Sequence, residues 1–150
     1  MDRIYIFQDL DAPEIKQVSL LMQSRKFGPG EVIYKEGDKG GALNIIVRGK
    51  VCINKTMVEG DQFCIATLKE GEEFGILSFM DGASHDAGII SEDNTELMVL
   101  SRSDFDKLAM SHPDIAVRML RKIALHLASI VRNMNSKQMD LMHLMFRKSK

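Results

Sequence analysis

The sequence predicts a mainly β fold with flanking helices: a double-stranded β-helix or jelly-roll barrel with an N-terminal helix and a long C-terminal helix. All 11 glycines lie at or before Gly88, and six of them recur every 7 to 12 residues, the spacing of short strands joined by turns. Apolar and polar residues alternate between these glycines. A stretch without glycine then runs from Pro113 to about Met145 with helical periodicity.

The first helix is expected to begin after Asp11. Asp11 and Glu14 have the spacing of a capping box, in which each side chain accepts a hydrogen bond from the other residue's backbone N–H. Pro13 is tolerated in the first helical turn. The apolar face that should pack against the barrel consists of Val18, Leu20, Leu21 and Met22.

The β region follows, with apolar or β-branched residues on one face of each run. A turn is expected at 92–94, where Glu, Asp and Asn follow one another. Together with their turns the runs indicate about eight strands, a number typical of jelly rolls. The runs lie at 32–35, 43–47, 51–53, 63–65, 87–90 and 97–100.

Two helices end the chain. Ser101 and Asp104 form a second capping pattern, which predicts a short helix that stops before Pro113. The helix that starts at Pro113 could reach about 50 Å at 1.5 Å per residue, with a bend or fraying expected at 136–138. The chain therefore divides into a jelly-roll domain with its N-terminal helix, 1–112, and a terminal helix, 113–150.

The terminal helix carries two apolar faces, so it needs two partners. We expect a parallel homodimer whose seam follows a spacing of three and four residues. The alternative is packing on its own barrel alone. The expected dimer seam contains Leu120, Ile123, Leu127, Ile130 and Met134. The second apolar surface contains Ala116, Met119, Ala124, Leu125, Ala128 and Val131.

Charge is unevenly distributed although the formal net charge is -1. Residues 1–112 hold 12 Lys or Arg against 19 Asp or Glu, whereas residues 113–150 hold 8 against 2. The segment 139–150 is basic and rich in methionine, and such a surface suits a partner protein or an anionic membrane. The alternatives are an extension of the dimer seam or folding back on the barrel.

Five motifs make the chain similar to the cyclic-nucleotide-binding domain family, which includes catabolite-activator regulators and kinase regulatory subunits. The likeness covers about residues 7–135. It implies a sensor barrel whose ligand changes the pose of the terminal helix. The motifs are FGPGEVI at 27–33, EGD at 36–38, IIVRGKV at 45–51, LKEGEEFG at 68–75 and HPDI at 112–115.

The resemblance places a phosphate-binding cassette at 74–87. In the family, backbone N–H groups and an arginine hold the cyclic phosphate, and a glutamate after the glycine holds the ribose hydroxyl. Here Ile76 stands at the glutamate position and His85, or Asp86 after a shift of one residue, at the arginine position. No Lys or Arg occurs between Lys69 and Arg102.

These departures decide the expected affinity. A hydrogen bond to a charged group contributes about 1.5 to 3 kcal/mol, so loss of both contacts costs about 3 to 6 kcal/mol. That loss corresponds to about a hundredfold to beyond ten-thousandfold in affinity. Binding of cyclic AMP or GMP is therefore expected to be weak or absent, and any binding through His85 should strengthen on acidification.

Two interpretations of the cassette stay open. In the first, the pocket still binds a small ligand. In the second, the pocket is filled, with Ile76, Leu77, Phe79 and Met80 as ordinary core. Ser129, on the terminal helix, is the candidate contact for a base. The candidate ligand-binding residues are Phe74, Gly75, Ile76, Leu77, Ser78, Ser84, His85, Asp86, Ala87 and Ser129.

The sequence lacks the residue patterns that other classes of function require. Cys52 and Cys64 have no CxxC spacing, which excludes a zinc finger, and buried reduced thiols are expected, with a redox pair across neighbouring strands as the alternative. The four histidines contain no HxH pair, so no metal is expected, and His126 and His143 are interpreted as helix-surface residues.

We expect no enzyme activity and no cofactor, since hydrolase and phosphate-loop motifs are absent. A jelly-roll enzyme is the distant alternative. The leading hypothesis is a cytoplasmic regulatory module that acts as a homodimer on an unknown downstream protein, without direct DNA binding. The alternative is a ligand-free dimeric scaffold.

Overall fold

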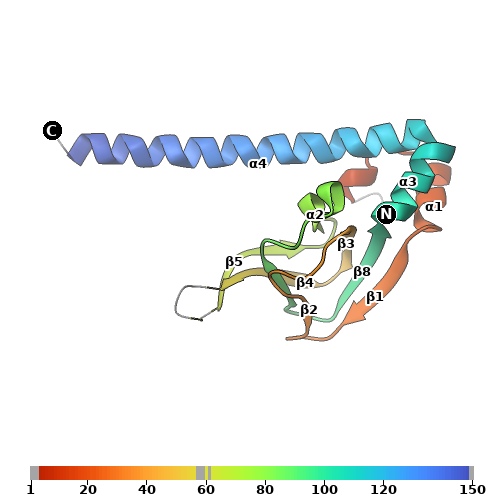
Figure 1. Cartoon of the computed structure of the whole chain (residues 1–150), viewed down its shortest axis with the longest axis horizontal. Helices are drawn as coiled ribbons and strands as arrows, with labels where there is room; N and C mark the ends of the chain where they lie inside the picture. Colours follow the sequence, from red (N-terminus) through yellow and green to blue (C-terminus); the bar gives the residue numbers. More distant parts are fainter. Residues whose placement is uncertain (1–3, 57–59, 61, 149–150) are drawn as a thin grey trace.

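The structure is a computed structural model that describes residues 4–56, 60 and 62–148, with the side chains of 141 and 144–148 left out of the description. Two antiparallel sheets of four strands form its barrel (Figure 1). Their strand orders are β1-β8-β3-β6 and β2-β7-β4-β5. This arrangement confirms the predicted mainly β, jelly-roll fold class with flanking helices.

The elements follow the expected order. The strands are β1 (Gln23–Phe27), β2 (Val32–Tyr34), β3 (Ala42–Arg48), β4 (Lys50–Thr56), β5 (Gln62–Lys69), β6 (Glu73–Phe74), β7 (Gly88–Ser91) and β8 (Thr95–Ser101). The helices are the 3-10 helix η1 (Tyr5–Phe7) and the α-helices α1 (Ala12–Ser19), α2 (Ile76–Asp81), α3 (Arg102–Ser111) and α4 (Pro113–Lys148).

Both predicted helix caps are present. The N–H of Glu14 donates to Asp11 Oδ1 at 2.9 Å, and the N–H of Asp11 donates to Glu14 Oε1 at 2.9 Å, which completes the capping box of α1. Ser101 caps α3 by accepting from the N–H of Asp104. The predicted apolar face of α1 is wrong at Leu20, which is 77% exposed, because the helix ends one residue earlier.

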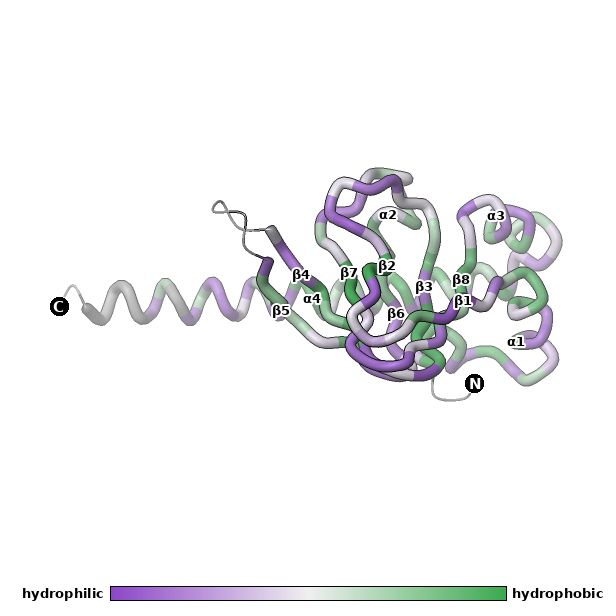
Figure 2. The backbone as a smooth tube through the Cα atoms, turned by 90° about the horizontal axis from the view of Figure 1, so that it is seen from below, coloured by the Kyte–Doolittle hydropathy of each residue, from purple (hydrophilic) through white to green (hydrophobic). Residues whose placement is uncertain are grey.

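The first half of α4 packs against the barrel, and the second half extends past it (Figures 1 and 2). Ile115, Met119 and Ile123 are buried in the main core cluster. From 129 onward every described side chain of α4 is exposed. The helix runs unbroken through 136–138, so the expected bend is wrong, and its end does not fold back on the barrel. No helix in the described part of the chain is long and apolar enough to span a membrane.

The predicted dimer seam is wrong in its first half. Ile123 is only 1% exposed, and Leu120 and Leu127 pack against the same cluster, because the barrel itself covers this stripe of α4. Ile130 and Met134, on the continuation of the stripe, are 41% and 64% exposed. The stripe therefore has an intramolecular partner where the barrel reaches it.

The expectation of buried, reduced thiols is also wrong. Cys52 on β4 and Cys64 on β5 form a disulfide. Cys52 is buried, whereas Cys64 is exposed on a strand that lies at the edge of its sheet.

Candidate ligand-binding cassette

The cassette lies between β6 and β7, and glycines set both ends of its helix α2. Gly75 has φ 78°, and a Cβ at this position would lie 3.0 Å from the carbonyl oxygen of Ala42. Gly82 has φ 74°, and its N–H donates to the carbonyl of Ser78 at 2.8 Å. The short helix is therefore held in place by backbone conformations that favour glycine.

Only one face of α2 belongs to the core. Ile76 and Phe79, three residues apart, are 7% and 3% exposed and lie in the main cluster. Leu77 and Met80 are 55% and 45% exposed on the other face. The second interpretation, in which all four are ordinary core, therefore fails for Leu77 and Met80, because a single short helix turns half of its residues to solvent.

Ile76 and His85 occupy the two positions where the resemblance calls for a glutamate and an arginine. The His85 ring stacks on the ring of Tyr34, with centroids 3.5 Å apart and an angle of 6° between the planes. Nδ1 of His85 lies 3.1 Å from Ser78 Oγ. The backbone N–H of His85 donates to the carbonyl of Asp38, so both the ring and the main chain are held.

Burial lowers the pKa of His85, and the nearby carboxylates of Asp38 and Asp86 offset this effect only in part. The imidazole therefore stays neutral at neutral pH. Burial also raises the pKa of the Tyr34 phenol, which keeps the stacked partner uncharged as well. This corner of the cassette supplies no positive charge to an anion.

The other sequence-predicted residues are more dispersed. Phe74 is buried in the barrel cluster, and Ser78 is 4% exposed. Ser84 and Asp86 are exposed, and Ala87 is half-buried. Ser129 is exposed and lines a groove formed by α4 residues alone. The structure thus brings Ser78 and His85 together but does not bring Ser129 to the cassette.

Arg102 is a residue near the cassette that sequence reasoning missed. Its guanidinium lies against Gly82, at the C-terminal end of α2, and its backbone N–H donates to the carbonyl of Gly41. A cation at this end of a helix interacts favourably with the helix dipole. Arg102 therefore stabilises the end of α2, and only the fold brings it there, from 20 residues further along the chain.

Glu73, directly before the cassette, connects it to α4. Its side chain is 1% exposed and forms an ion pair with Nδ1 of His126 on α4. The Tyr5 ring packs edge-on against His126 with centroids 5.9 Å apart, and Lys122 Nζ lies 4.8 Å from the centroid of Tyr5. The interpretation of His126 as a plain surface residue is therefore wrong.

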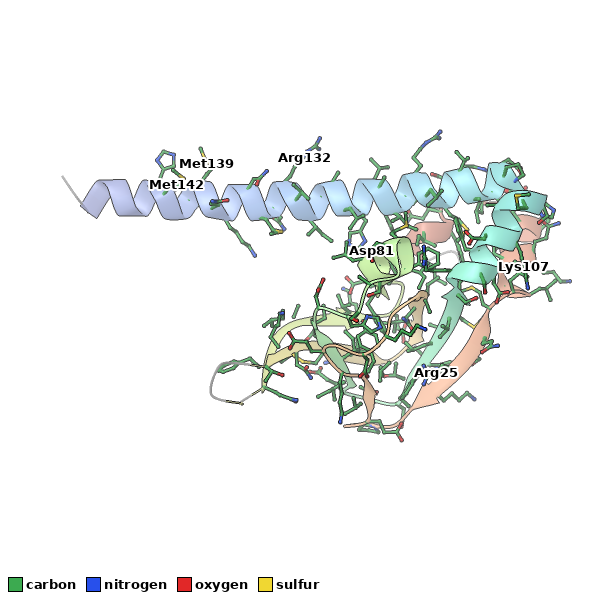
Figure 3. The ribbon with its side chains drawn as sticks, in the orientation of Figure 1. Arg25, Asp81, Lys107, Arg132, Met139 and Met142 are labelled. Carbon is green, nitrogen blue, oxygen red and sulfur yellow. A yellow bond between two sulfur atoms is a disulfide. The ribbon has the colours of Figure 1, made fainter. Side chains whose placement is uncertain are left out.

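The Glu73 carboxyl is poorly solvated. Burial raises its pKa above the usual range, and the charge and hydrogen bond of His126 oppose this rise. Figure 3 shows α2, marked by Asp81, below α4, with Arg132 further along α4 towards its C-terminal end. The start of the cassette is therefore joined to α4 by a pair of ionisable groups.

The comparisons with known proteins agree with this fold. The family model "Cyclic nucleotide-binding domain" matches residues 24–112. The cyclic AMP receptor protein of Thermus thermophilus is 32% identical over 111 residues, 74% of this chain and 51% of that protein. A cyclic nucleotide-gated channel of Caenorhabditis elegans is 31% identical over 126 residues, 80% of this chain and 17% of the channel.

Among solved structures, the catabolite activator protein of Thermus thermophilus superposes with a TM-score of 0.82 at 28% identity. The match covers 91% of this chain and 62% of that one. The chain thus spans about half to two thirds of these bacterial relatives. Since the family model matches more than half of the residues, the chain belongs to the cyclic nucleotide-binding domain family.

Proposed function

We propose that this chain is a cytoplasmic, non-catalytic regulatory module that acts as a homodimer, binds cyclic AMP or GMP weakly or not at all, and passes its output through α4 to another protein. The observation that carries the proposal is the state of His85. Its ring is stacked on Tyr34 and hydrogen-bonded to Ser78 where the family places a guanidinium, and burial lowers the pKa of the imidazole.

The ribose position supports the same conclusion. Ile76 is 7% exposed within the main core cluster, so its side chain packs against protein and has no acceptor for a hydroxyl. Both contacts that would hold a cyclic mononucleotide are thus replaced by groups with other partners. A less anionic ligand would lose less binding affinity from the absence of these two contacts.

The output path rests on Glu73 and His126. Glu73 lies two residues before Gly75, which caps α2, and its buried carboxylate pairs with a side chain of α4. A shift of the cassette backbone would have to carry Glu73 with it or break the pair. The helix arrangement and the state of the cassette are therefore coupled, which is the requirement for a population shift between two helix poses.

The dimer contact is assigned to the outer face of α4, defined by Val117, Ala124, Leu125, Ala128 and Val131. Val117, Leu125 and Val131 are 51%, 52% and 53% exposed, although they are apolar. Val117, Ala124 and Val131 recur every seven residues, with Ala128 four residues after Ala124, which is the spacing of a two-helix seam. The small alanines let a second helix approach closely.

A ligand-free dimeric scaffold is the second candidate. The observation that favours it is the stacking of the His85 ring directly on the ring of Tyr34, with centroids 3.5 Å apart. The two candidates share the dimer and differ in whether the cassette can open.

A variant of His85 tests the proposal. His85→Arg restores a guanidinium, so calorimetry with cyclic AMP at pH 7 should show an affinity at least tenfold above that of the wild type. His85→Gln is the matched control, because it removes the ring without adding charge, and it should show no gain. A gain in both variants would refute the electrostatic cause. A gain in neither would favour the scaffold.

A further inference from the structure

We propose that Cys52 and Cys64 form a reversible thiol–disulfide exchange site, which thiols attack at Cys64 and where Glu92 selects against negatively charged thiols. The site lies on the hairpin of β4 and β5. Its residues take no part in the cassette or in the outer face of α4.

The disulfide spans an irregular part of the ladder between β4 and β5. Cys52 is paired with Thr67, but the register then shifts between Ile53 and Asn54, so that Asn54 is paired with Cys64. The bond therefore joins the two strands across a bulge. Because β5 is an edge strand with β4 as its neighbour, reduction would leave it held by the ladder alone.

Exposure determines which sulfur is attacked. Cys64 is exposed, whereas Cys52 is 6% exposed. A thiolate from solvent must reach the sulfur that it attacks, and access is one of the factors that set the rate of exchange. Cys64 Sγ is therefore the electrophile, and Cys52 Sγ is the leaving group.

Glu92 places a negative charge beside the point of attack. Its Oε1 lies 3.9 Å from Cys64 Sγ, and the Thr67 hydroxyl, 4.0 Å from the same sulfur, is uncharged. Glu92 belongs to the exposed turn between β7 and β8. Two unit charges about 4 Å apart in water interact strongly enough to change a rate about fivefold. Every small thiol attacks as its thiolate, so a thiol whose remaining groups are anionic should react more slowly than one of similar intrinsic reactivity that carries an ammonium group.

Reduction of the disulfide consumes two molecules of a small thiol. The first thiolate bonds to Cys64 Sγ, the S–S bond breaks, and its electron pair goes to Cys52 Sγ, which takes a proton from water. The first thiol is now bound to Cys64 as a mixed disulfide. A second thiolate attacks the sulfur of that bound thiol and releases the thiolate of Cys64. The protein gains two electrons and two protons, and the two small thiols become one disulfide.

Kinetics with two probe thiols test the site. The probes are glutathione, which is net anionic, and cysteamine, which carries an ammonium group. Alkylation and mass spectrometry would measure how fast each probe frees the protein thiols of the wild type and of Glu92→Gln. We expect Glu92→Gln to accelerate exchange with glutathione about fivefold and with cysteamine less than twofold. Equal acceleration for both probes would overturn the role of Glu92.

Three measurements on the wild type complete the test without a variant. The protein purified without reductant should have no alkylatable thiol after denaturation, and the trapped mixed disulfide should map to the peptide of Cys64. Two free thiols in that protein, or a first adduct on Cys52, would overturn the proposal. Hydrogen exchange on reduction should quicken for β5 amides and stay unchanged for β8, and an unchanged β5 would show that the disulfide does not hold the edge strand.

Discussion

Glu73 is the residue whose ionisation most directly links the cassette to α4. Because its folded-state pKa is raised by burial, the folded protein holds this proton more tightly than the unfolded chain. Its contribution to stability is therefore full at low pH and is lost as pH rises through the raised value.

We predict that Glu73→Gln flattens this dependence. Between pH 4 and pH 8.5 the free energy of unfolding of the wild type should fall by about 1 to 3 kcal/mol relative to the variant, since ionising a buried carboxyl group costs free energy of this order. Chemical denaturation at both pH values measures the difference.

Glu31→Gln is the matched control, because Glu31 is exposed. It should follow the wild type at both pH values. An equal pH dependence in the wild type and Glu73→Gln would mean that the carboxylate is not the titrating group.

At the scale of elements, Arg118 joins α4 to α1. Its guanidinium donates to both carboxylate oxygens of Glu14, the residue that also closes the capping box, and to the carbonyl of Asp9 at 3.0 Å. The hydrogen bond from Arg118 is the largest cause that lowers the pKa of Glu14, to about 2. Stability from this pair is therefore present above the ordinary carboxyl pKa and is lost as pH falls towards 2.

We predict that Arg118→Gln raises the midpoint pH of acid unfolding, measured by circular dichroism, and that its difference from the wild type vanishes below about pH 2. Arg121→Gln, an exposed change one turn further along α4, should leave the midpoint in place. A difference between Arg118→Gln and the wild type that persisted unchanged at pH 2 would contradict the assignment to Glu14.

Local patterns explain which elements could be predicted from the sequence. The caps at Asp11 and Ser101 depend on residues three apart in the chain, and both are present. The strand β1 was not predicted, because its sequence QSRKF is polar and four of its five residues are exposed. It forms by pairing with β8, where Gln23 is opposite Val99, and that partner lies far away in the sequence.

At the scale of the whole molecule, the outer face of α4 is apolar and exposed, which predicts assembly. We expect the wild type to sediment as a dimer and Val131→Glu as a monomer, because a carboxylate in a two-helix seam is desolvated. Met110→Glu is the matched control, since Met110 on α3 is 87% exposed and lies outside this face. A monomeric wild type, or a dimeric Val131→Glu variant, would contradict the proposed dimer.

The site was predictable only where its residues are contiguous. The span of the cassette and the positions of Ile76 and His85 follow from motifs in one stretch of sequence. The partners of the cassette do not, because His126, Arg102 and Tyr34 reach it from other elements. The dimer seam failed for a related reason. Periodicity shows that α4 has two apolar faces, but the core covers residues of both, Ile123 on the expected seam and Ala116 and Met119 on the second surface.

Calorimetric titration of the wild type with cyclic AMP at pH 7 tests most directly whether the cassette lacks the charge to hold a cyclic phosphate. The neutral, stacked His85 and the buried Ile76 predict no measurable heat at submillimolar nucleotide. A saturable heat with a dissociation constant in the micromolar range would contradict this account.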